Sequence, residues 1–444
     1  MSSQEAEPQL AKTLSPLMIW GLGVGYVISG EYFGWNLGLA HGGPYGMLAA
    51  TLIVTVMYVA FVLSYAELAC AIPKAGGAFV YAQRAFGSKI GLLAGTAQWI
   101  EFVFAPPAIA FAIGAYFANF TPGIPPLALA MGAYVMFTGL NMWGVKQSAI
   151  FELVITILAV GELLIFAGVT APAFQWSNFS TNPLPNGWLG VLPALPFAIW
   201  FYLAIEGVAN VAEEAKNPQR DISRGFLYSI GTLVFLALLV FFTSIGVAGW
   251  EQIVYDPNTG EPSDSPLPLA LGFLLGTEHP LFHLLITVGL FGLIASFHGI
   301  LLVAGRATFE FGRAGYFPRV LGDIHPNRQT PVKALIFNLC VGFVALLSGK
   351  TSDIITLSVF GALALYIISM LALLKLRKTE PELERPYRAP GFPYVPYVAL
   401  GLALGCFLAV FYYNLKIGLI FVAIVGLAFA YFSQRGGAQE EKAA

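Results

Sequence analysis

The stretch from Trp20 to Trp35 reads WGLGVGYVISGEYFGW, and it lies inside an apolar run over residues 17–40. That run is long enough to cross a bilayer, for which about 20 residues suffice. Glu31 lies in its middle, and an ionisable side chain at that depth is costly enough to mark a functional site by default. The glycines around Glu31 predict a point where the helix breaks and turns free backbone groups toward a small ligand.

The composition sets the fold class: 57% of the 444 residues are hydrophobic and only 10% are charged, which excludes a soluble domain. We expect an all-α polytopic membrane protein whose chain forms a single transmembrane domain over residues 15–432. Windows of about 18 or more mostly apolar residues predict 12 transmembrane helices. They cover residues 17–40, 46–69, 90–118, 124–143, 150–170, 190–212, 226–249, 280–304, 333–348, 353–374, 394–413 and 416–432.

The basic residues predict the orientation of these spans. With the N-terminus in the cytoplasm, all of the 22 Lys and Arg residues except Lys350 and Lys416 fall on the cytoplasmic side. This agrees with the positive-inside rule. We therefore expect a multi-pass protein of the cell (plasma) membrane with both termini cytoplasmic. Residues 1–14 and 433–444 are short polar tails, and we expect them to be disordered.

Four acidic residues lie near the middle of predicted spans. At about 1.5 Å per residue, Glu31, Glu101 and Glu162 fall near mid-membrane, and Glu206 falls a little below it. No Lys or Arg is buried in the first six spans, so this arrangement suits a proton or an organic ammonium as the partner. The alternative is that each acid is protonated and hydrogen-bonds a neighbouring helix.

Two further acids, Glu67 and Glu152, fall near the cytoplasmic ends of their spans. We expect both to lie at the interface or to pair with cations of the loops.

Polar and aromatic side chains near the acids complete the candidate site. Ser296 and His298 on the eighth span can approach its lower half, although a lone His in a bundle is more often an interhelical hydrogen-bond partner. Tyr26, Trp200 and Tyr202 can close a small pocket and attract an ammonium through their ring faces.

The sequence contains no HExxH, no Cys-x-x-Cys cluster, no Walker loop and no Gly-x-Ser-x-Gly elbow, which argues against an enzyme. We expect no metal, no cofactor and no nucleic-acid partner. The partners that remain are the lipid bilayer and a small solute. A channel shares this hydropathy, and a carrier differs from it in saturable flux and counter-transport.

Several segments carry a family resemblance. Residues 206–218, with Arg220, Asp221 and Ile222 beyond them, resemble the end of the sixth helix in the amino acid–polyamine–organocation (APC) superfamily. The order and spacing of four other segments match as well: YAELACAIPKAGGAFVYAQRAFG at 65–87, NMWGVKQSA at 141–149, GRAGYFPRVLGDIHPNRQTPV at 312–332 and RPYRAPGFPYVP at 385–396.

The resemblance implies a secondary transporter with a LeuT-like 5+5 inverted repeat plus two peripheral helices. Repeat one would cover about 15–171, repeat two about 189–375, and the extra helices about 394–432. Spans one and six would be the broken helices that form the site. Span one is expected to break near Ser29-Gly30, and span six between Ala204 and Gly207, where the carbonyls of Ala204 and Ile205 become free.

Two departures from the superfamily bear on the substrate. Amino acid permeases of this group usually carry Gly-Ser-Gly in span one, where this chain has Ser29-Gly30-Glu31. A carboxylate there repels a substrate carboxylate. Many relatives also carry a Lys in span five, at the position of Ala159 here, and the next ionisable residue is Glu162.

Two segments are most similar to bacterial ethanolamine permeases: VISGEYFGWN at 27–36 and WIEFVFAPPAIAFAIGAYF at 99–117. The resemblance implies uptake of ethanolamine or a close small amine, linked to protons or to exchange. The ammonium would meet Glu31, Glu101 or the unwound carbonyls, and the hydroxyl would meet Ser29 or Tyr202. Trp200 would be an aromatic gate, and Glu206 a gating or proton-responsive acid. The alternative is a general amino acid permease or antiporter in which Glu31 is protonated or points away.

Overall fold

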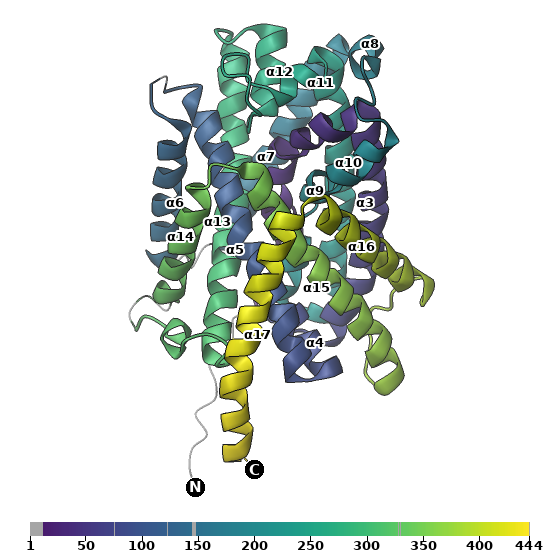
Figure 1. Cartoon of the computed structure of the whole chain (residues 1–444), viewed down its shortest axis with the longest axis vertical. Helices are drawn as coiled ribbons and strands as arrows, with labels where there is room; N and C mark the ends of the chain where they lie inside the picture. Colours follow the sequence, from purple (N-terminus) through teal and green to yellow (C-terminus); the bar gives the residue numbers. More distant parts are fainter. Residues whose placement is uncertain are drawn as a thin grey trace.

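The computed structural model describes residues 12–74, 76–121, 123–143, 148–326, 328 and 330–443. Within these residues the chain is helical and forms no strand. The helices pack into one bundle, with α11 and α12 at one end and with α4 and the C-terminal end of α17 at the other (Figure 1).

The α-helices are α1 (Pro16–Val27), α2 (Ser29–Tyr32), α3 (Leu39–Ala71), α4 (Ala78–Phe86), α5 (Ser88–Ala118), α6 (Pro126–Trp143), α7 (Ser148–Thr170), α8 (Trp176–Ser180), α9 (Val191–Trp200), α10 (Pro218–Ala248), α11 (Trp250–Val254), α12 (Pro266–Leu275), α13 (Pro280–Arg313), α14 (Val332–Leu346), α15 (Thr351–Thr379), α16 (Tyr394–Tyr413) and α17 (Leu415–Ala443). The 3₁₀ helices are η1 (Trp35–Gly38), η2 (Ala171–Ala173), η3 (Trp188–Gly190), η4 (Ile205–Glu214) and η5 (Arg319–Gly322).

Nine helical segments in the described part of the chain are long and apolar enough to cross a membrane. The other three predicted spans fall on α1 with α2, on α6 and on α14, which are helical but shorter or less apolar. The all-helical class is therefore confirmed. The count of 12 crossings and the inverted repeat stay predictions.

Large apolar side chains cover the outside of the bundle. Val344 on α14, Leu408 on α16 and Leu427 on α17 are 72%, 68% and 72% exposed. Exposed apolar surface on this scale marks a membrane or protein interface. The lipid bilayer is the partner that fits the hydropathy of the spans.

The two broken helical segments lie inside the bundle. α1 packs against α7, α10, α13 and η4, and α9 packs against α3, α15 and α16. α5 packs against both α13 and α15, so it closes the same central space from another side. This arrangement places the carboxylates of α2, α5 and η4 in the interior.

The chain turns between the first two predicted spans at Gly43, whose backbone has φ 62° and ψ −175°. Pro44 follows it and cannot continue the preceding helix. At the other end the structure differs from the prediction, because α17 continues to Ala443 and residues 433–443 prolong the helix. Residues 1–11 of the expected N-terminal tail and residues 144–147 of the segment 141–149 lie outside the described residues.

Candidate functional site

The first span leaves regular helical geometry shortly after Glu31, at Phe33 and Gly34. α1 ends at Val27, the four residues of α2 follow Ile28, and Phe33 is extended before Gly34 with φ 88°. Ser29 and Gly30, where the break was expected, lie in the short helix α2 instead. The interruption is real, but it follows the Ser29-Gly30-Glu31 motif.

The sixth predicted span breaks opposite the break in the first span. α9 ends at Trp200, residues 201–204 form a turn, and η4 begins at Ile205. Ala204 has φ 78°, in the left-handed region where a residue with a side chain is strained. The predicted break between Ala204 and Gly207 is thus confirmed at its first residue.

Two glycines of the first span let the broken segments meet. A Cβ on Gly30 would collide with the Trp200 carbonyl, and one on Gly34 would lie 2.5 Å from the Trp200 ring. Only a residue without a side chain permits this approach. The two breaks therefore form one centre.

Glu31 lies in this centre without a hydrogen-bond donor for its side chain. It is fully buried, and neither carboxylate oxygen has a partner among the described residues. No Lys or Arg in the described part of the chain forms an ion pair with it. A buried carboxyl group in this state requires a proton or a cation.

Glu101 and Glu206 form a carboxyl pair beside the second break. The Glu101 Oε1 atom accepts from the Ala204 N–H at 3.3 Å, and Glu206 Oε2 accepts from the Tyr366 hydroxyl at 3.0 Å. The charges of the two carboxyl groups act on each other, and their remaining oxygens, Glu101 Oε2 and Glu206 Oε1, have no hydrogen-bond partner among the described residues. Two neighbouring buried carboxylates without a cation repel each other, so one of the two must carry a proton.

Two hydroxyl groups of the predicted site are engaged. Ser296 donates to the Tyr26 carbonyl at 2.6 Å, so Ser29, 2.8 Å from Ser296, is the donor between the two serines. The Tyr202 hydroxyl lies 2.7 Å from Thr55 Oγ1 on α3. The hydroxyls of Ser29 and Tyr202 both remain able to accept a hydrogen bond from a solute.

Trp200 is 2% exposed, and its indole N–H has no acceptor among the described residues. Its ring packs edge-on against Phe33 at 5.5 Å. It thus packs against the first break from the end of α9. The Tyr26 ring lies on the opposite helix, packed against Gly207 and Gly299.

Glu162 lies apart from Glu31. Its Oε2 atom accepts from the Tyr32 hydroxyl at 2.7 Å, and the same hydroxyl lies 3.0 Å from the Ala159 carbonyl. Glu162 is therefore held by the residue next to Glu31 in sequence, through a neutral phenol.

The prediction for Glu67 is confirmed, and that for Glu152 is wrong. Glu67 accepts from Arg377 at 2.6 and 2.7 Å and lies 3.2 Å from Arg385. Glu152 is 1% exposed and lies 3.8 Å from His298, away from any loop cation. The reason is lateral packing, since α13 extends alongside the early turns of α7.

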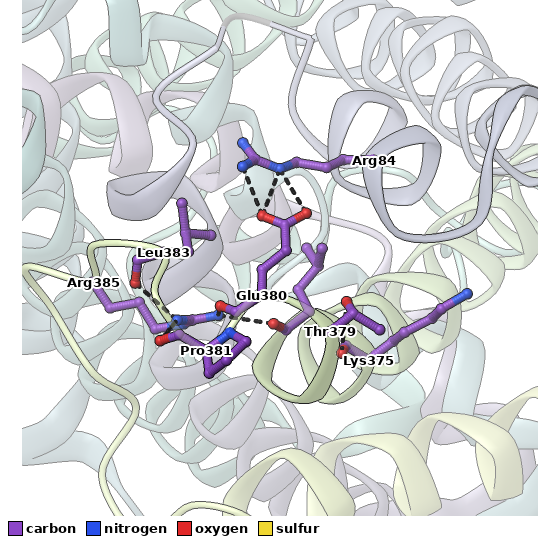
Figure 2. Close-up of polar contacts among 8 residues, drawn as sticks. Arg84, Lys375, Thr379, Glu380, Pro381, Leu383 and Arg385 are labelled. Atoms are coloured by element: carbon purple, nitrogen blue, oxygen red, sulfur yellow. Dashed lines mark hydrogen bonds and ion pairs between the residues drawn. The ribbon is translucent and has the colours of Figure 1, made fainter.

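A second ion pair lies at the same end of the bundle as Glu67. Figure 2 shows the Arg84 guanidinium on α4 facing the Glu380 carboxylate, with bonds of 2.7 to 3.1 Å, while Arg385 points to the carbonyls of Pro381 and Leu383. The hydrogen bonds from Arg84 lower the pKa of Glu380. These contacts tie α4 to the end of α15.

The sequence reasoning missed the hydroxyl groups around Glu206. Tyr58 on α3 and Tyr366 on α15 are buried with their hydroxyls 3.0 Å apart, and Tyr366 also bonds Glu206. A tyrosine in mid-span was the available signal, but 19 tyrosines in the chain made it weak. Within the described residues no group of three or more His, Cys, Asp or Glu side chains could hold a metal ion.

A sequence model described as amino acid permease matches residues 14–433, nearly the whole chain. The chain belongs to the amino acid permease family. The resemblance to the APC superfamily is thereby confirmed, whereas the ethanolamine branch remains a prediction.

Individual relatives are similar over most of their length. An uncharacterized transporter of Rhizobium meliloti is 28% identical, with 91% of this chain and 87% of the relative covered. A methylthioribose transporter of Bacillus subtilis is 26% identical, with 91% and 89% covered. A branched-chain amino acid permease of the same species is 24% identical, with 90% and 88% covered. These relatives are named as transporters, which agrees with a transport protein and not an enzyme.

Proposed function

We propose that this chain is a secondary active transporter that imports ethanolamine or a closely related small amine across the plasma membrane. Family membership supports transport, and Glu31 supports the amine. Its carboxyl group is buried in the broken first span without a donor. An ammonium would bring the positive charge and the N–H donors that this group lacks.

The proposal makes one specific claim about the substrate, which is that it carries no carboxylate. Amino acid substrates would bring their own carboxylate toward Glu31, and two like charges at low dielectric repel by several kcal/mol. Ethanolamine carries a hydroxyl instead, for which Ser29 and Tyr202 are the proposed partners. The ring of Trp200 offers the ammonium a cation–π contact.

The second candidate is a general amino acid permease or antiporter. The family match and the name of the branched-chain amino acid permease favour it over ethanolamine. It requires Glu31 to be protonated or turned away from the solute. The name of the methylthioribose transporter indicates that family membership alone leaves the substrate open.

The proposed roles fall into two groups. Solute contacts are assigned to Tyr26, Ser29, Gly30, Glu31, Glu101, Trp200, Tyr202, Ala204 and Ile205. Coupling and gating are assigned to Glu31, Glu162, Glu206, Trp200, Ser296 and His298, with protons or an exchanged solute as the driving partner. Alternating access would move one group of helices against another around the two breaks.

The test is uptake of labelled ethanolamine into proteoliposomes, with and without a proton gradient and with excess serine, alanine, choline or putrescine. Saturable uptake that unlabelled ethanolamine blocks and serine does not block supports the amine site at Glu31. Blockade by serine or alanine would move the assignment to an amino acid permease. Linear, non-saturable flux would contradict a carrier of either kind.

A further inference from the structure

One further buried acid, Glu152, lies apart from the two breaks. Glu152 on α7 and His298 on α13 are 1% and 4% exposed, and the Glu152 Oε2 and His298 Nδ1 atoms are 3.8 Å apart. That separation is too long for a hydrogen bond. Both carboxylate oxygens and the imidazole Nδ1 lack a partner among the described residues. Three buried polar atoms that face one another without a hydrogen-bond partner form an incomplete site.

The space for Glu152 is made by glycines on the two helices that face it. A Cβ on Gly25 of α1 would lie 2.6 Å from Glu152 Oε1, and one on Gly299 of α13 would lie 3.3 Å from the same atom. Thr156, one turn along α7, donates to the Gly21 carbonyl of α1 at 3.1 Å. The carboxyl group therefore rests directly on the backbone of the first half of the broken span.

Few other charged groups can neutralise Glu152. From α1 the Tyr26 phenol faces Glu152. The charges of Arg306 and Glu214 interact electrostatically with the same phenol. Arg306 is itself paired with Glu214 at 3.2 Å. From α10, which also packs against α7, no side chain among the described residues bonds or pairs with Glu152. His298 is thus the titratable partner.

We propose that Glu152 and His298 together form a proton-binding site that couples solute uptake to the proton gradient. This inference rests on the proposed transport function and assigns its coupling ion to a place outside the solute centre. One proton from the outer water adds to the carboxylate and the neutral imidazole. The O–H or N–H so formed bridges the two groups after they approach by about 0.6 Å or more. The same proton leaves to the inner water.

The contact between Glu152 and Gly25 of α1 links proton binding to movement of the first span. With the proton bound, the pair is neutral and the packing at Gly25 can stay closed. With the proton lost, a buried carboxylate remains, and its charge favours separation of α1 from α7 and α13 so that water can enter. Ser296, two residues from His298, bonds the Tyr26 carbonyl and Ser29. The proton site and the first break therefore share one hydrogen-bonded segment.

Transport assays can separate proton coupling by Glu152 and His298 from binding of the solute. Proteoliposomes with a one-unit pH gradient, alkaline inside, and with the membrane potential clamped at zero would accumulate a solute about tenfold if one proton moves with it. Both labelled ethanolamine and labelled serine would be used. We expect Glu152→Gln and His298→Gln to abolish this accumulation and to keep solute counterflow. Glu310→Gln, an exposed acid on α13 paired with Arg313, is the matched control and should keep both.

The proton site also has a readout that needs no solute. Infrared difference spectra of the reconstituted protein between acid and alkaline pH should contain a carboxyl C=O band that Glu152→Gln removes and His298→Gln shifts. Wild-type accumulation in Glu152→Gln, loss of counterflow together with accumulation, or an unchanged band would each overturn the proposal. If the wild type carries neither solute, the proposed function fails, and the infrared titration still decides whether Glu152 binds a proton.

Discussion

The substitution Glu31→Gln tests the solute centre most directly. It keeps the shape of the side chain and removes the charge. Because neither oxygen of Glu31 has a donor among the described residues, an incoming ammonium would make the first hydrogen bonds to this group. A hydrogen bond to a charged group contributes about 1.5–3 kcal/mol, and 1.4 kcal/mol is tenfold in affinity. The half-saturating ethanolamine concentration should therefore rise by about ten- to a hundredfold.

The assay is the initial rate of ethanolamine counterflow in proteoliposomes as a function of concentration. Equal insertion of the variant is checked by the amount of folded protein in the vesicles, and Glu310→Gln serves as the control for loss of an exposed acid. A half-saturating concentration within about twofold of wild type would refute the reasoning, because it would mean that Glu31 makes no charged contact with the solute. Serine uptake that Glu31→Gln leaves intact would instead favour the amino acid permease.

Three further predictions concern other carboxyl groups. Glu206→Gln should shift the pH at which uptake is half-maximal yet retain accumulation, since it alters the carboxyl pair with Glu101 but not the proton site proposed at Glu152 and His298; an unchanged pH profile would reassign Glu206 to packing. Glu67→Gln should lower the free energy of unfolding by about 3–5 kcal/mol, because Arg377 and Arg385 lose their buried partner; an unchanged thermal midpoint in detergent would mean that water neutralises them. Burial raises the pKa of Asp264 to about 7 from an ordinary 3.8, so its contribution to stability is complete below that ordinary value and is lost as pH rises through about 7; Asp264→Asn should remove this slope in thermal unfolding, and a persistent slope would contradict the assignment.

The spans could be predicted because hydropathy depends on composition along one helix. All predicted spans fall on helical segments, although the number that cross the membrane is not settled by length alone. The sequence predicts the break in the first span near Ser29-Gly30, because glycine permits an irregular backbone. In the structure, Gly30 stays helical and is needed for its close approach to Trp200. The irregular dihedrals fall on Phe33 and Gly34 instead.

The environment of Glu152 could not be predicted for a related reason. Depth along a helix does not reveal which neighbour lies beside it. Glu152 is only four residues from the start of α7, yet α13 and the glycine face of α1 enclose it. Likewise, the pairing of Glu101 with Glu206 joins residues 105 positions apart, and no spacing within either span indicates it.

Alanine at position 204 places the second break near a balance between two backbone states. The left-handed conformation costs a residue with a side chain about 1–2 kcal/mol, and a continuous helix through Ala204 would release that amount. The Ala204 N–H bond to Glu101, a bond to a charged group when that carboxyl is ionised, contributes about 1.5–3 kcal/mol in the other direction. Two opposing contributions of similar size make the shape of this segment sensitive to a single proton on Glu101.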